Sequence, residues 1–178
     1  MRLRLRPLSR GLLALALVFQ CLVAGAAPLE AGALWPGLTL PDQHDKAVRL
    51  AGDKLQVVLF TAERKPGDWA QDLVEKAYKD AVLAGRLVLV FDISRMPSLV
   101  TTMFALPGFR ARPFPILLAR DAEPVAFLPR QEAAVTVLTF DGGKLAAIDY
   151  AKDEAALERL LAQRLATPTP TPNLKEQP

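Results

Sequence analysis

Residues 55–92 read LQVVLFTAERKPGDWAQDLVEKAYKDAVLAGRLVLVFD, and this stretch decides the fold. It opens with LQVVLF (55–60), a continuous apolar run of the kind found in strands that are buried on both faces. It closes with RLVLVFD (86–92), a second run of the same kind. The pattern between them predicts a helix over roughly 69–84. A strand, a helix and a second strand form a βαβ unit, in which the two strands are parallel.

The predicted helix carries start and stop signals. Asp68 is placed as an N-cap, and Gln71 follows three residues later, at the spacing of a capping box. Gly85 supplies the stop. Apolar residues at every fourth position are expected to face the sheet. They are Trp69, Leu73, Ala77 and Ala81.

Shorter signals surround this unit. The turn-rich phrase PDQHDK (41–46) separates two short runs, which predicts an N-terminal β-hairpin. A short apolar helix is expected over 98–106, and PGFRARPFP (107–115) is expected to break it. PILLAR (115–120) is expected to be a third core strand, and PVAFLP (124–129) a weaker one.

The C-terminal part has the clearest local pattern. Two alternating runs, AVTVLTF (134–140) and KLAAIDY (144–150), flank Asp141-Gly142-Gly143, which predicts a hairpin. A last helix is expected from about Asp153 to Leu165, with a leucine stripe. Together these elements predict an α/β fold with a mixed β-sheet flanked by helices.

The two ends of the chain differ from the part between them. Residues 1–27 combine four arginines, an apolar run and the exit Ala24-Gly25-Ala26, which predicts a cleaved signal peptide; an uncleaved anchor is the alternative. Residues 28–166 are expected to form the domain. Residues 167–178, which begin TPTPTP, are expected to be a disordered tail. The expected location is the periplasm, with no membrane contact after cleavage.

Charge and cysteine content narrow the function. Residues 1–27 hold four of the 22 basic residues and none of the 19 acidic ones, so the remaining chain has a formal charge of −1. This near-neutral balance gives no support to a nucleic-acid partner. The only cysteine, Cys21, would leave with the signal, so dithiol exchange and thiol peroxidase chemistry lack their thiolate.

Three phrases resemble the thioredoxin-like superfamily, in its secreted redoxin and peroxiredoxin-related branch. They are LTLPDQHDKAVRL (38–50), LQVVLFTAERKPGDW (55–69) and GGKLAAIDYAKDEAALERLL (142–161). The first is similar to the family's entry hairpin, the second to its active-site strand and loop, and the third to its terminal hairpin and helix. DISRMPSLVTTMFALPGFR (92–110) also resembles a segment of uncharacterised secreted bacterial proteins of this fold.

The resemblance implies where the family's active site would lie. The two cysteines of its Cys-x-x-Cys motif would fall within Glu63, Arg64, Lys65 and Pro66, and neither position is filled. The family's cis-proline could correspond to Pro115. In a second register, 135–150 is the terminal hairpin and 113–130 an insertion, so that Ala134 precedes the strand and no proline occupies the site.

Other chemistry has little support from the residues. Glu63 and Lys65 could form a carboxylate–amine pair, although exposed charges on such a loop are usually only solvated. The acidic turn at 42–45 is explained by Asx-turn formation, so no metal site is predicted. No phosphate-binding or nucleotide motif occurs, and no cofactor is predicted.

A candidate binding surface remains in MPSLVTTMFALPGF (96–109). Met96, Met103, Phe104 and Phe109 could line an adaptable groove for an envelope protein or peptide, or the segment could be a core helix. The preferred hypothesis is a redox-inactive thioredoxin-like binding module. The alternative is an oxidoreductase or redox accessory that acts through a bound cofactor or a partner's cysteines.

Overall fold

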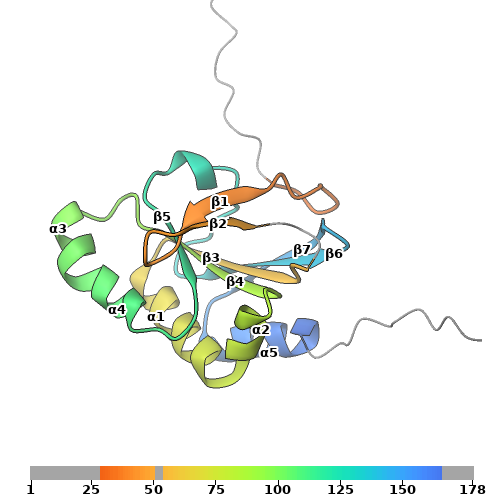
Figure 1. Ribbon diagram of the computed structural model, residues 1–178. Coiled ribbons are helices and arrows are strands. Elements are labelled where there is room, and N and C mark those ends of the chain that lie inside the picture. Colours follow the sequence, from red (N-terminus) through yellow and green to blue (C-terminus); the bar gives the residue numbers. More distant parts are fainter. Residues whose placement is uncertain (1–28, 51–53, 166–178) are drawn as a thin grey trace, which may run out of the picture.

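The computed structural model describes residues 29–50 and 54–165. Its centre is a mixed five-stranded sheet in the order β5-β4-β3-β6-β7, flanked by helices (Figure 1). Both the sheet and the separate N-terminal hairpin agree with the predicted α/β class. The strand bounds are β1 Leu38–Pro41, β2 Ala47–Leu50, β3 Val57–Thr61, β4 Leu87–Asp92, β5 Ile116–Ala119, β6 Val135–Asp141 and β7 Lys144–Ala151.

The predicted βαβ unit is confirmed. β3 and β4 are parallel neighbours, with Val57 opposite Leu87 and Thr61 opposite Phe91. All five β3 residues are buried, as expected for a strand covered on both faces. The helical connection between the strands consists of α1 (Arg64–Leu73), the π-helical turn η1 (Val74–Tyr78) and α2 (Lys79–Leu83).

The predicted start of this helix is wrong. α1 begins at Arg64, with Glu63 at the N-cap, so Asp68 lies inside the helix and the residues 63–66 are its first turn instead of a loop. Pro66 is compatible with this start because the first turn of a helix needs no N–H from that position. Gln71 does not act in a capping box; its Nε2 donates to the carbonyl of Gly67 at 3.1 Å.

The predicted apolar stripe of this helix is correct only in part. Leu73 and Ala81 are buried and Trp69 is half-buried, but Ala77 is exposed. Ala77 lies in the π-helical turn η1, which widens the coil between Val74 and Tyr78. The four-residue spacing therefore fails at Ala77, inside the turn, and Ala81 beyond it is buried as predicted.

The segment 98–110 forms a continuous helical arm, which is the name used below. It consists of α3 (Ser98–Val100), the π-helical turn η2 (Thr101–Ala105) and α4 (Leu106–Arg110). The predicted helix break at Pro107 is wrong, because Pro107 lies in the first turn of α4, where a missing N–H is tolerated. Figure 1 shows the arm extending sideways from the sheet beside α1.

The later part of the chain settles the open strand register. PILLAR supplies β5, parallel to β4. The predicted weak strand PVAFLP is wrong, because its first two residues lie in the 3-10 turn η3 (Glu123–Val125) and none of its residues belongs to a strand. β6 pairs antiparallel with β3 and then with β7, so 135–151 is the terminal hairpin. Its turn residues Gly142 and Gly143 have φ of 54° and 79°, as a two-residue turn of this type requires.

Two apolar layers hold the sheet. One face packs on α1, α2 and α5 (Glu154–Leu165), where Leu157 and Leu161 of the predicted leucine stripe are fully buried. The other face packs under β1 and β2 and the segment around Val125 and Leu128 (Figure 1). None of the helices in the described ranges is long and apolar enough to cross a bilayer. The predicted signal peptide and tail lie outside the described residues.

Candidate functional site

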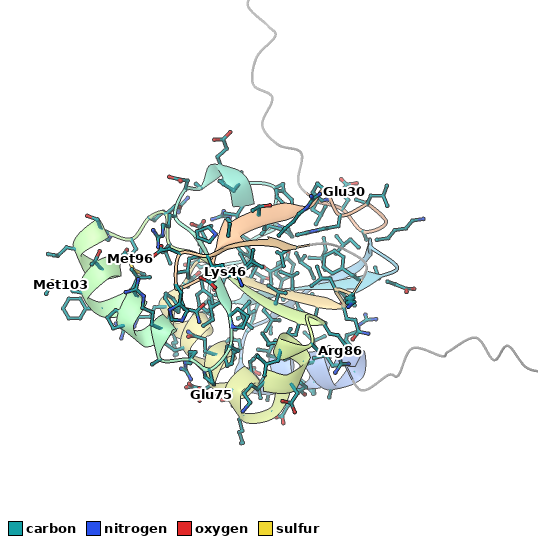
Figure 2. The ribbon with its side chains drawn as sticks, in the orientation of Figure 1. Glu30, Lys46, Glu75, Arg86, Met96 and Met103 are labelled. Carbon is teal, nitrogen blue, oxygen red and sulfur yellow. The ribbon has the colours of Figure 1, made fainter. Side chains whose placement is uncertain are left out.

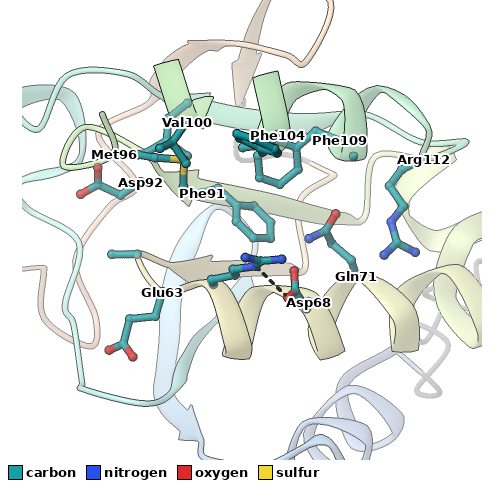
Figure 3. Close-up of a pocket in the computed structure, with 15 residues that line it drawn as sticks. Glu63, Asp68, Gln71, Phe91, Asp92, Met96, Val100, Phe104, Phe109 and Arg112 are labelled. Carbon is teal, nitrogen blue, oxygen red and sulfur yellow. Dashed lines mark ion pairs between the residues drawn. The ribbon is translucent and has the colours of Figure 1, made fainter. Parts of the chain in front are cut away.

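A cavity of about 230 Å³ opens between the first turns of α1, the end of β4 and the arm (Figure 3). It is called the site cavity below. It brings together two regions that the sequence analysis had treated separately, the 63–66 segment and the Met/Phe segment. Its lining residues are Ala62, Glu63, Arg64, Asp68, Gln71, Phe91, Asp92, Ile93, Met96, Val100, Phe104, Ala105, Gly108, Phe109 and Arg112.

The floor of the site cavity is aromatic. The rings of Phe91, from β4, and Phe109, from α4, meet edge to face with centroids 5.1 Å apart. Phe91 also lies against α1 at Gly67, where a Cβ atom would come within 2.4 Å of the ring carbon Cε1. Glycine at this position therefore allows the ring to lie close to the first turn of α1. Both phenylalanines are buried, so the floor is formed before any ligand arrives.

The arm forms the opposite wall. Met96 is half-buried, and Val100 and Phe104 are 41% and 71% exposed. Of the four predicted binding residues, Met96, Phe104 and Phe109 line the site cavity. Met103 does not; it is 60% exposed and points away from the sheet on the outer side of the arm (Figure 2).

The 63–66 segment is largely tied to other parts of the protein. The carboxylate of Glu63 accepts a hydrogen bond of 2.8 Å from the N–H of Ala133, in the loop before β6. Figure 3 shows this carboxylate turned away from the site cavity. Arg64 pairs with Asp68 at 3.5 Å, Lys65 is exposed, and Pro66 is buried. The possible Glu63–Lys65 pair, against which the sequence analysis favoured solvated charges, does not occur among the ion pairs of the described residues.

The candidate cis-proline is corrected by the structure. No cis peptide bond occurs among the described residues, so the bond before Pro115 is trans. Pro115 precedes β5, which pairs with β4 at the other side of the sheet from β6. The position next to the start of α1 is instead the loop before β6, where Ala133 and Ala134 stand. The second register, without a proline, therefore holds.

A buried ion pair closes one end of the site cavity. The Asp92 side chain is 1% exposed at the end of β4, and its Oδ2 atom lies 2.5 Å from Arg130. Burial alone would raise the pKa of Asp92, but hydrogen bonds from Ser94 and the charge of Arg130 outweigh it, so the pKa lies below its usual range. Arg130 also lies over the Phe60 ring, 5.1 Å from its centroid.

A second cluster closes the other end. Arg112, just after the arm, lies 2.6 Å from Asp72 and 2.5 Å from Glu75 on the α1–η1 helix. Burial would lower the pKa of Arg112, but the hydrogen bonds to these two carboxylates raise it. Beside this cluster Gln71, which is 4% exposed, turns its carboxamide toward the site cavity (Figure 3).

Sequence reasoning missed Phe91, Gln71 and Arg112 as site residues. Phe91 was hidden in an apolar strand, and Arg112 in a segment taken as a helix break. Gln71 was assigned to a capping box. The available signal was Asp92, because side chains at the carboxyl ends of parallel strands lie where ligands bind in α/β sheets.

The described residues offer few groups for thiol or metal chemistry. None of them is a cysteine, and they contain no cluster of three or more His, Cys, Asp or Glu side chains that could hold a metal ion. The charged residues that line the site cavity are engaged with one another or with nearby groups. The arrangement is suited to holding an apolar group against an aromatic floor.

Several solved structures are similar to this chain. A Chlorobium tepidum protein described as a thiol:disulfide interchange protein DsbE has a TM-score of 0.57 and 20% identity, covering 78% of this chain and 97% of that chain. A Bacteroides thetaiotaomicron protein described as a protein disulfide isomerase has a TM-score of 0.53 and 18% identity, covering 76% and 87%. The peroxidoxin BcpB from Mycobacterium tuberculosis has a TM-score of 0.53 and 16% identity, covering 79% and 99%.

No protein-family model and no curated protein sequence matches the chain. The likeness to the solved structures concerns the fold alone. It agrees with the strand order, the βαβ unit and the terminal hairpin described above. This chain therefore has the thioredoxin-like fold, although its sequence contains no Cys-x-x-Cys pair.

Proposed function

We propose that this chain is an exported, redox-inactive binding module that holds a segment of an envelope protein or peptide in the site cavity. The observation that carries the proposal is the site cavity itself, which lies where α1 begins and has an aromatic floor and an exposed apolar wall. Exposed apolar side chains beside a preformed apolar cavity are typical of interaction sites. Val100 and Phe104 are such side chains here.

The absence of thiol chemistry rests on the residues. Thiol–disulfide exchange needs an attacking thiolate and a thiol leaving group. In the segment that follows β3, Glu63 binds the backbone of Ala133 and Arg64 binds Asp68, so these side chains serve structural contacts. Export is supported by the arginines, apolar run and small-residue exit of residues 1–27.

A peptide-display experiment tests the binding role. A random peptide library is selected against the purified exported protein, with its natural sequence, and the recovered peptides are titrated against the same protein. Peptides that bind saturably and are enriched in large apolar residues support the proposal. A selection that yields no binding peptide would contradict it.

Activity assays test the second half of the proposal. The same protein is added to insulin with dithiothreitol, and to peroxide with a thiol donor. Both rates are expected to equal the uncatalysed rates, because the protein offers no thiolate. Native mass spectrometry of the exported protein addresses the alternative, since a cofactor would appear as added mass. Turnover above background, or a bound cofactor, would favour the oxidoreductase hypothesis.

A further inference from the structure

The size of the site cavity limits what it can hold. Pockets for cofactors and drug-sized ligands usually measure about 300–1,000 Å³. The site cavity, at about 230 Å³, is smaller than this range. Its floor of Phe91 and Phe109 is buried and held in place, so the space cannot deepen without displacing α1 or α4. One large side chain fits such a space better than a whole cofactor does.

The charged groups around the site cavity already have hydrogen-bond or ion-pair partners. Five charged residues line it, and each has a partner within the described part of the chain: Glu63 with the Ala133 N–H, Arg64 with Asp68, Asp92 with Arg130, and Arg112 with Asp72 and Glu75. A charged ligand would compete with these existing partners. We therefore expect charge to contribute little to ligand selection.

One polar group remains for the ligand. Gln71 uses its Nε2 to donate to Gly67, and its carboxamide oxygen is left to accept a hydrogen bond at the edge of the site cavity. Gln71 is 4% exposed, so this acceptor oxygen has little contact with solvent. A peptide N–H beside an inserted side chain is a natural donor for it.

We propose that the site cavity takes a single aromatic or large aliphatic side chain from an uncharged polypeptide segment, and that Gln71 Oε1 accepts the N–H of that segment. This inference rests on the proposed function and gives its ligand class. It predicts that binding depends on the bulk of one side chain and on one hydrogen bond, and that salt changes it little.

The methyl NMR signals of the methionines report directly on binding in the site cavity. Apart from Met1, the chain has only Met96, which lines the site cavity, and Met103, which lies outside it. In protein labelled with [13C-methyl]methionine, N-acetyl-phenylalanine amide and N-acetyl-leucine amide should shift the Met96 signal saturably, and the Met103 signal much less. N-acetyl-alanine amide and N-acetyl-aspartate amide should shift Met96 little. The affinity should change less than about twofold between about 50 and 500 mM salt.

The hydrogen bond is tested by a paired substitution. Gln71→Leu should lower the affinity for N-acetyl-phenylalanine amide about threefold to tenfold. The same substitution should not change the affinity for N-acetyl-phenylalanine amide in which every amide nitrogen is methylated, because this probe has no N–H to donate. If Gln71 had only a structural role, the substitution would lower the affinities for both probes equally. That result would remove Gln71 from the proposal.

Failure of this inference and failure of the proposed function give different results. If the selected peptides bind with Phe104 dependence but through charged residues, or if the aspartate probe shifts Met96 as much as the phenylalanine probe does, the ligand class is wrong and the binding module stands. If no peptide is selected and no probe moves Met96, both fail.

Discussion

Asp92 shows how a single carboxylate organises this site. It joins the end of β4 to Arg130, which follows η3 in the chain, and it accepts the N–H of Ser94 at 2.9 Å. Asp92→Asn keeps the shape and removes the charge, so it should lower the free energy of unfolding by about 1.5–3 kcal/mol near neutral pH. Urea denaturation measures this, and Asp121→Asn, at an exposed carboxylate, is the matched control.

The same residue predicts a pH dependence. The pKa of Asp92 is lowered in the folded protein, so the unfolded chain binds this proton more readily. The stabilisation from the carboxylate is present above the ordinary value of 3.8 and is lost as the pH falls through the folded pKa. The stability difference between wild type and Asp92→Asn should therefore shrink on acidification from about pH 6 to below about pH 3. If the stability difference between wild type and Asp92→Asn did not change with pH, a group other than the Asp92 carboxylate would be the partner of Arg130.

Glu63 supplies a second prediction at this scale. Ala133 has a φ of 54°, an uncommon conformation for a residue with a side chain, and its N–H is bound by the Glu63 carboxylate. Glu63→Ala should cost about 0.5–1.5 kcal/mol of unfolding free energy. Lys65→Ala, two residues along and exposed, should change it by less than about 0.5 kcal/mol. Equal effects would show that Glu63 is merely solvated.

Helix packing against β4 depends on a glycine in α1. A Cβ atom at Gly67 would lie 2.4 Å from Phe91, whereas one at Gly108, in α4, would meet nothing within 4 Å. Gly67→Ala should destabilise the protein by about 1–3 kcal/mol and narrow the site cavity. Gly108→Ala should be neutral or stabilising by up to about 1 kcal/mol. Urea denaturation of the two variants gives the comparison, and a neutral Gly67→Ala would place the Phe91 ring elsewhere.

At the scale of elements, the sequence predicted what local patterns determine. Continuous apolar runs identified β3 and β4, and Asp141-Gly142-Gly143 identified the terminal hairpin, because those signals are local. The start of α1 was misplaced, since Pro66 reads as a breaker although a first helical turn accepts it. The π-helical turn η1, where Ala77 is exposed, has no local signal in the sequence.

The site itself was only half predictable. The Met/Phe segment was recognised from its composition, and the 63–66 segment from resemblance. Their meeting across one cavity depends on the arm lying beside α1, which is fixed by long-range contacts such as Arg112 with Asp72. A single sequence does not display contacts of that kind. That Ala134, and no proline, precedes the strand beside β3 followed only once β6 was seen to pair with β3.

Taken as a whole molecule, the protein has the thioredoxin-like sheet, and the site cavity lies at the edge of that sheet where α1 begins. The β-sheet and both apolar layers are complete, so the fold does not depend on the missing cysteines. The first turn of α1 is bound to the loop before β6 through Glu63, and exposed apolar residues lie on the arm beside it. That arrangement is what the binding proposal explains.

The most direct measurement is the affinity of a library-selected peptide for three forms of the protein, by isothermal titration. Phe104 and Leu83 are both large and exposed, at 71% and 59%, but only Phe104 lines the site cavity. Phe104→Ala is predicted to weaken binding at least about tenfold, as truncation of an interface anchor does, and Leu83→Ala to change it less than about twofold. Equal affinities for wild type and Phe104→Ala, or a larger loss in Leu83→Ala, would contradict the account.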